Sequence, residues 1–74
     1  MSDLEKLDPN LVRQYTGAYG PFQAGDYRIG DTVKAPGVSG EVIWSYRSAG
    51  KGLVYVVDDS SGFPVEIAAN EVRG

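Results

Sequence analysis

The sequence contains no cysteine and no histidine. It therefore offers no disulfide bond, no zinc site of the usual kind and no histidine base for a serine nucleophile. A chain of 74 residues buries only about 60% of the surface that its unfolded form exposes, so its fold is marginally stable without such reinforcement. Self-association is the remaining common source of stability, and we expect a homo-oligomer.

Long apolar runs and an excess of positive charge are also missing. The first twenty residues hold no segment resembling a signal peptide or a membrane span. Seven basic residues stand against ten acidic ones, and the net charge of −3 repels phosphate groups. We therefore expect a cytoplasmic protein that binds neither membranes nor nucleic acid.

Two regions differ in composition, an N-terminal arm of residues 1–26 and a barrel of residues 27–74. After a short helix, the arm holds an irregular loop in which Tyr19 and Phe22 supply apolar area without strand or helix periodicity. Two interpretations stay open. These rings cover one end of the barrel, or they dock on a partner, because tyrosine is enriched among the residues that dominate binding at interfaces.

The helix of the arm has clear start and stop signals. Ser2 and Glu5 fit a capping box, but Pro9 would end any helix that begins there. A better start has Asp8 as N-cap and Pro9 at the first helical position. Gly17 is suited to end this helix.

Four short segments rich in β-branched and aromatic residues follow, separated by turn residues. They are residues 27–35, 41–47, 53–58 and 63–68. Residues 69–71 suit a single 3₁₀ turn that leads into Val72. This spacing predicts an all-β fold, a small closed barrel.

Period-two alternation predicts which side chains share a face of each strand. The predicted sets are Ile29, Val33 and Ala35; Val42, Trp44 and Tyr46; Leu53, Tyr55 and Val57; and Val65 and Ile67. The third strand is apolar on its other face too, through Val54 and Val56. We expect the arm or another subunit to cover that face.

A meander of short strands that ends in a 3₁₀ turn and a last short strand resembles the Src-homology-3-like barrels, over roughly residues 30–72. This resemblance implies a five-stranded barrel. Peptide-binding members of that class carry an Ala-Leu-Tyr-Asp-Tyr-like opening and a Trp-Trp doublet, and this chain has neither. Recognition of proline-rich peptides is therefore not implied.

Several motifs are similar in order and spacing to the plasmid-borne type II dihydrofolate reductases. They are Gly30-Asp31-Thr32-Val33-Lys34, Gly40-Glu41-Val42-Ile43-Trp44-Ser45-Tyr46, Tyr55-Val56-Val57 and Val65-Glu66-Ile67. The resemblance implies a homotetramer with one central pore that binds NADPH and dihydrofolate. Its site residues in this chain would be Lys34, Val65, Glu66 and Ile67.

The chain departs from that family at the active-site strand, which reads Val-Gln-Ile-Tyr there and Val65-Glu66-Ile67-Ala68 here. Glu66 would place four like charges near one symmetry axis and disfavour a polyanionic cofactor. Ala68 lacks the ring that lines the pore. The family's basic residue aligns with Ala35, and the adjacent Lys34 points to the opposite face. The reductase is therefore the alternative interpretation.

A further resemblance is to the KOW-type modules of ribosomal and transcription factors, which display a basic surface to RNA or dock on a protein. Gly30-Asp31-Thr32-Val33 and Gly40-Glu41-Val42 carry it. The basic residues Lys34, Arg47 and Lys51 are matched by acidic ones at Glu41, Asp58, Asp59 and Glu66. Docking on a protein fits this balance better than binding RNA.

The leading interpretation is a non-enzymatic module for protein–protein interaction, of a size that suits a phage, a plasmid or another mobile element. We predict no catalytic residue, cofactor or metal site. The candidate binding residues are Tyr19, Phe22, Trp44, Tyr46 and Phe63. The strand that holds Glu66 is the expected edge for self-association.

Trp44 and the loop of residues 58–62 each allow a second interpretation. Trp44 belongs to the core if it points inward and anchors an interface if it points outward. Residues 58–62 read as a solvated hairpin loop, because they lack the ligand spacing of a calcium loop and the lysine of a phosphate loop.

Overall fold

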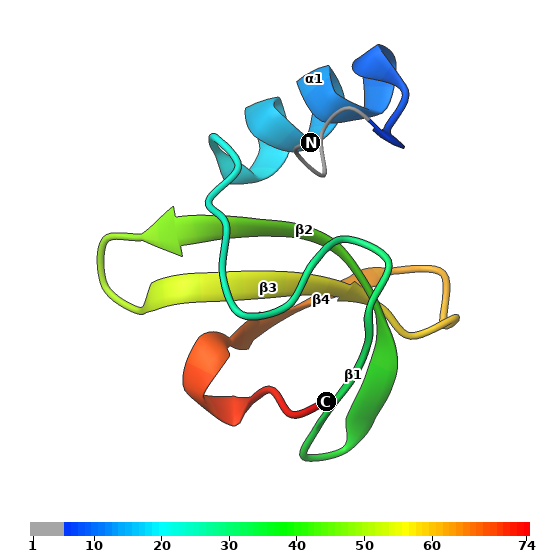
Figure 1. Ribbon diagram of the computed structural model, residues 1–74, viewed down its shortest axis with the longest axis vertical. Coiled ribbons are helices and arrows are strands. Elements are labelled where there is room, and N and C mark those ends of the chain that lie inside the picture. Colours follow the sequence, from blue (N-terminus) through cyan, green and yellow to red (C-terminus); the bar gives the residue numbers. More distant parts are fainter. Residues whose placement is uncertain (1–5) are drawn as a thin grey trace.

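A four-stranded antiparallel sheet is the centre of the structure, a computed structural model that describes residues 6–74. The strands β1 (Thr32–Ala35), β2 (Val38–Ser48), β3 (Gly52–Asp58) and β4 (Pro64–Ala68) are hydrogen-bonded in that order. The sheet curls into a half-barrel, and the helix α1 (Pro9–Tyr19) lies across one face of it, over β2 (Figure 1). A mostly β fold with one helix is thus confirmed.

The predicted closed barrel of five strands is wrong. Segment 27–35 becomes a strand only at Thr32, because Arg28 and Asp31 close a turn before it: the Asp31 N–H donates to the Arg28 carbonyl (3.0 Å) and the Arg28 N–H to the Asp31 carboxylate (2.8 Å). Near the C-terminus, Arg73 makes a single antiparallel bridge to Lys34, with N···O distances of 2.6 and 2.7 Å. One bridge takes the place of the fifth strand, so the sheet stays a half-barrel.

The 3₁₀ turn predicted at residues 69–71 is confirmed as η2 (Ala69–Glu71), and it delivers Val72 into the core. The core lies inside the curl of the sheet. Its buried members are Val33, Val42, Tyr55, Val57, Ile67 and Val72. The predicted inward positions Val33, Val57 and Ile67 are therefore confirmed, and Ile29 lies in the turn that precedes β1.

The predicted alternation in β2 is wrong, because a β-bulge interrupts it between Val42 and Trp44. Val42 pairs with Val57, but Trp44 pairs with Val56, the preceding residue of β3. One additional residue in a strand moves every later side chain of that strand to the opposite face of the sheet. Val42 therefore enters the core, while Trp44 and Tyr46 lie on the opposite, outer face.

The apolar character of β3 on both faces is confirmed. Tyr55 and Val57 belong to the core, and Val54 and Val56 are fully buried on the outer face. In the register of the sheet, Val56 lies opposite Trp44 and Val54 lies opposite Tyr46. A single chain therefore covers the outer face of its own central strand.

The start of the helix is confirmed and its predicted end is wrong. Asp8 is the N-cap, and its carboxylate accepts the N–H of Asn10 at 2.8 Å. The helix passes through Gly17 and ends at Tyr19, and the N–H of the C-cap residue Gly20 donates to the Thr16 carbonyl at 2.8 Å. An interior glycine costs a helix only about 1 kcal/mol, which the packing of the last turn offsets. The capping box at Ser2 and Glu5 lies outside the described residues.

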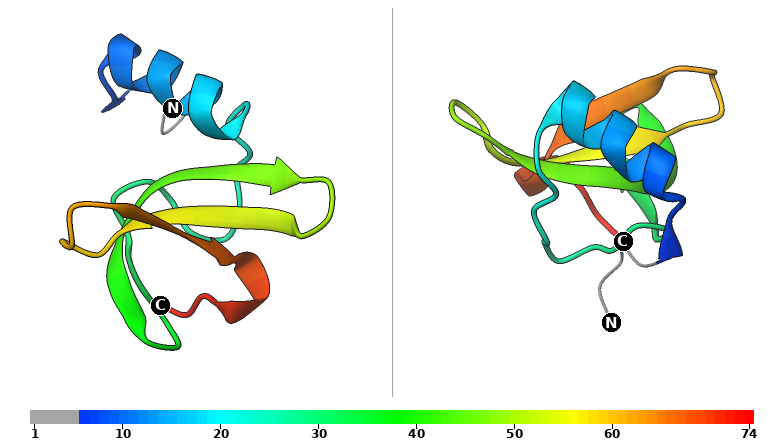
Figure 2. Two further views of the ribbon diagram at one scale, coloured as in Figure 1. Left: turned by 180° about the vertical axis from the view of Figure 1, so that it is seen from behind. Right: turned by 90° about the horizontal axis from the view of Figure 1, so that it is seen from above.

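The segment after α1 is fastened along β2 by hydrogen bonds. The Gln23 N–H donates to the Ser45 carbonyl (2.9 Å), and the Ser45 hydroxyl donates to the Gln23 carbonyl (2.7 Å). In the view from above (Figure 2, right), α1 lies across the sheet, and the segment that follows the helix runs along one side of the sheet. No helix within residues 6–74 has the length and apolar character that a bilayer crossing requires.

Candidate functional site

Aromatic rings join the arm to the outer face of β2. Tyr15 and Phe22 contact the ring of Trp44, with centroid distances of 5.5 and 5.4 Å. Tyr19 stacks on Tyr46 at 5.8 Å. Such pairs contribute about 0.5–1.5 kcal/mol beyond the area they bury. No residue of α1 is fully buried. The ring contacts of this aromatic cluster therefore hold the helix against the sheet.

Four of the five predicted binding residues lie in this cluster, where they contact each other. Trp44 points outward, as an interface anchor would, yet it is fully buried by the arm. Phe22 is half-buried against it, and Tyr19 is half-buried against Tyr46. The cluster is therefore an internal junction, and the fifth predicted residue, Phe63, lies apart from it on the loop between β3 and β4.

A tyrosine and a carboxylate meet beside the cluster. The Tyr46 hydroxyl donates to the Glu66 carboxylate across β3. This hydrogen bond, followed by partial burial, raises the pKa of Tyr46 above its usual 10.0. Burial and then the Glu66 charge also raise the pKa of Tyr19. Both phenols therefore stay protonated near neutral pH, and that of Tyr46 acts as a hydrogen-bond donor.

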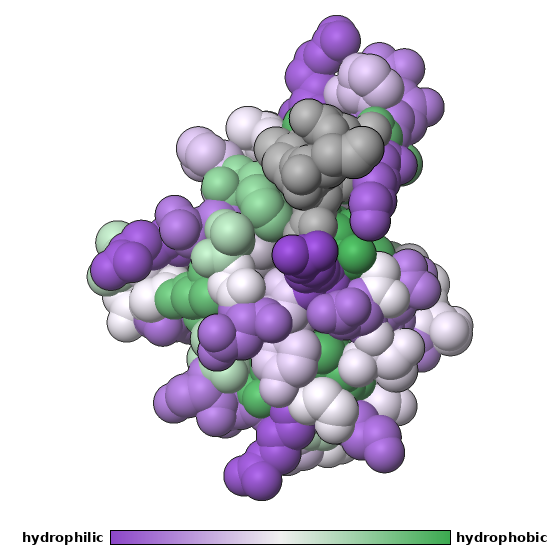
Figure 3. Space-filling model, viewed as in Figure 1, coloured by the Kyte–Doolittle hydropathy of each residue, from purple (hydrophilic) through white to green (hydrophobic). Residues whose placement is uncertain are grey.

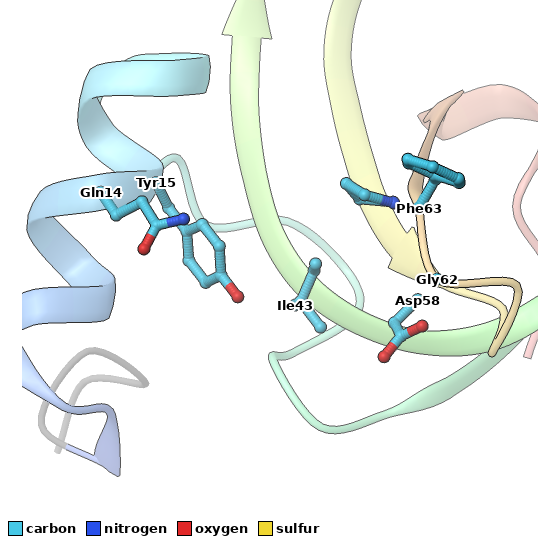
Figure 4. A pocket seen from close by; sticks show the side chains of 7 residues that line it. Gln14, Tyr15, Ile43, Asp58, Gly62 and Phe63 are labelled. Atoms are coloured by element: carbon cyan, nitrogen blue, oxygen red, sulfur yellow. The ribbon is translucent and has the colours of Figure 1, made fainter.

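A cleft of about 300 Å³ opens between α1 and the β3–β4 loop. Its lining combines rings, an aliphatic floor and two polar groups, from Gln14, Tyr15, Ile43, Asp58, Gly62, Phe63 and Pro64. Gln14 and Tyr15 project from α1 toward Ile43 on β2, with Asp58 and Phe63 on the far side (Figure 4). The bulge creates the floor, because Ile43 is the residue left without a partner in the ladder.

Phe63 is the most exposed large apolar side chain in the described residues, with 77% of its surface accessible. The loop that carries it is built from two local turns. Asp58 accepts the Ser60 N–H at 3.0 Å, and Asp59 accepts the Ser61 N–H at 2.9 Å. Hydrogen bonding of the Asp59 carboxylate with the side chain and then the N–H of Ser61 lowers the pKa of Asp59. The loop is solvated, as expected, and it also presents Phe63 and Asp58 to the cleft.

Sequence reasoning missed most of the cleft. Of the residues that line it, only Phe63 is among the candidate binding residues predicted from the sequence. The available signal was Ile43 itself, an aliphatic residue between Glu41 and Ser45 at positions expected to be polar. No local signal brings Gln14 or Tyr15 close to Asp58, because that proximity depends on where the helix packs.

The residues of the reductase alternative are spread over the molecule. Lys34 is exposed on β1, and the other three lie on β4, at the opposite edge of the sheet. Ile67 belongs to the core and Val65 packs against it, while Glu66 is exposed on the outer face. A single chain therefore does not bring Lys34 and Glu66 together.

Most of the face shown in Figure 3 is hydrophilic, with small apolar patches between polar residues. Within residues 6–74, no three acidic side chains gather in a metal-binding arrangement. Comparisons with protein-family models, with curated proteins and with solved structures give no match.

Proposed function

We propose that this chain is a non-enzymatic interaction module that binds a protein partner at the cleft between α1 and the β3–β4 loop. The observation that carries the proposal is the exposure of Phe63 at the wall of the cleft. Burial of a phenylalanine side chain stabilises a complex by about 1.5–3 kcal/mol. A chain that buries or half-buries its other aromatic rings and leaves this one accessible offers an anchor for binding.

The surroundings of Phe63 support a docking role. Pro64 and Ile43 extend the apolar lining of the cleft. Polar groups from Gln14 and Asp58 stand beside them. Apolar area with a few convergent polar groups is typical of binding sites.

Self-association is a second part of the proposal, and it uses β4. This strand pairs with β3 on one side and has no strand of the described chain on the other. Such an edge offers unpaired backbone groups to a second copy. The exposed Glu66 disfavours pairing in which two such carboxylates face each other, so an antiparallel arrangement with offset register is expected.

Selection of peptides from a randomised display library on the full chain tests the binding site. We expect enriched peptides that lose at least about tenfold in affinity for Phe63→Ala, because the variant removes the anchor. Lys51→Ala is the control. Lys51 comes just before β3, at the opposite end of that strand from Asp58 and the cleft. A selection that enriches nothing, or peptides that bind Phe63→Ala unchanged, would contradict the proposal.

A further inference from the structure

The charges at the cleft are of one sign. Among the described residues that line the cleft, Asp58 carries the only charge. Directly opposite it in the register of β2 and β3 is Glu41, and both side chains are exposed. Like charges at facing positions of two strands repel each other. A cation bound between them would relieve that repulsion.

The backbone holds the two carboxylates in this arrangement. Gly40 precedes Glu41 and lies so close to Asp58 that a Cβ built on it would come within 2.7 Å of the Asp58 carbonyl carbon. The Asp58 carboxylate is oriented by the Ser60 N–H. A carboxylate has about four lone-pair sites, so this one hydrogen bond leaves capacity for donors from a ligand.

Each side of the cleft that holds this carboxylate carries an aromatic ring. Tyr15 reaches in from α1 and Phe63 from the β3–β4 loop (Figure 4). The negative face of such a ring attracts the head group of a lysine or arginine. Ile43 offers an apolar floor for the aliphatic stem that precedes the charge.

We propose that the cleft binds a lysine or arginine side chain from a basic segment of a protein partner, with Asp58 as its counter-ion. This inference rests on the proposed function and specifies the chemistry of the partner. A volume of about 300 Å³ is at the lower limit for ligand pockets and suits one or two side chains. The acidic rim repels nucleic acid and anionic membrane surfaces, which leaves a basic protein segment as the occupant.

Three display libraries of equal aromatic and aliphatic content test this chemistry on the full chain. The first contains Lys and Arg, the second has Gln and Asn in their place, and the third has Asp and Glu. We expect enrichment from the basic library only. Equal enrichment from the neutral or the acidic library would overturn the inference and leave the proposed function standing. No enrichment from any library would overturn both.

A pair of variants in the same loop isolates the charge. Asp58→Asn keeps an oxygen for the Ser60 N–H and removes the charge that lines the cleft. Asp59→Asn likewise keeps an acceptor for the Ser61 N–H and removes an equal charge that does not line the cleft. We expect basic peptides to bind Asp58→Asn about tenfold more weakly and Asp59→Asn with less than about a twofold change. Equal losses in both variants would overturn the role of Asp58.

The oligomeric state separates a foreign partner from a second copy of this chain. Light scattering of the wild type and of Asp58→Asn gives the molar mass of each. An unchanged mass is expected, because self-association is assigned to β4. An oligomer that dissociates in Asp58→Asn would assign the cleft to a second copy and overturn the proposal.

Discussion

The indole N–H of Trp44 donates to the carbonyl oxygen of Gly20 across 3.2 Å, and so ties the sheet to the C-cap residue of α1. The same ring receives Tyr15 and Phe22 of the arm. One buried side chain of β2 thus positions the helix. Because the helix forms one wall of the cleft, the candidate binding site depends on this junction as well.

Replacement of Trp44 by phenylalanine keeps a ring and removes the indole N–H. We expect the free energy of unfolding to fall by about 1–3 kcal/mol, because the Gly20 carbonyl loses its donor and a cavity remains. Denaturation in urea measures the loss. Phe63→Ala is the control: it removes a large side chain from an exposed site and should change stability by less than about 0.5 kcal/mol. Equal losses would contradict the assignment.

Removal of residues 1–22 tests the arm as a cover. It deletes the rings that pack on Trp44 and Tyr46 and exposes the outer face around Val56. At about 1.5–3 kcal/mol for each large apolar side chain, we expect a loss of several kcal/mol. Thermal unfolding and molar mass of both chains are the measurements. A truncated chain with an unchanged melting temperature would show that the arm contributes nothing to the fold.

Gly25 lies against the side chain of Tyr55, so that a Cβ added there would overlap the phenol oxygen. Tyr55 is buried and its hydroxyl accepts the Tyr27 N–H at 3.2 Å, so it has little freedom to move. We expect Gly25→Ala to destabilise the protein by about 1–3 kcal/mol. Gly50→Ala is the matched control, because nothing lies within 4 Å of its added Cβ. Similar melting temperatures for the two variants would refute the close approach.

The Tyr46–Glu66 hydrogen bond predicts an alkaline dependence of stability. The bond requires the neutral phenol, so the folded state holds this proton above the unfolded pKa of 10.0. Its contribution is complete below that pH and is lost as the pH rises through the raised folded pKa. The stability of the wild type should therefore exceed that of Tyr46→Phe by a margin that shrinks above pH 10. Urea unfolding of both proteins at a series of pH values checks this, and a constant margin would rule it out.

An assay with NADPH and dihydrofolate separates the module from the reductase alternative. We expect no turnover, because Glu66 stands where that family has glutamine and Ala68 where it has tyrosine. Turnover that Ile67→Ala abolishes in a folded protein would reverse this expectation. A buried core position such as Ile67 requires a check of folding, for which circular dichroism is sufficient.

The local elements of this protein were predictable from its sequence. Asp8 and Pro9 start the helix through a side-chain cap and a fixed φ angle, and both act within one turn. The positions of three of the four strands, the doubly apolar β3 and the turn at η2 follow from residue type and periodicity over a few neighbours. Each depends on interactions between residues that are close in the sequence, and for this reason it can be predicted without knowledge of the tertiary structure.

Only the tertiary structure decided the facing of β2, the open barrel and the cleft. The bulge at Ile43 reverses the alternation because the register with β3 requires it, and no property of Ile43 alone specifies that register. The helix passes Gly17 because Tyr19 finds a ring to stack on at Tyr46. The cleft joins Tyr15 to Asp58 and Phe63, which are more than forty residues away in the chain. Such contacts depend on packing across the whole fold, and the local sequence does not specify them.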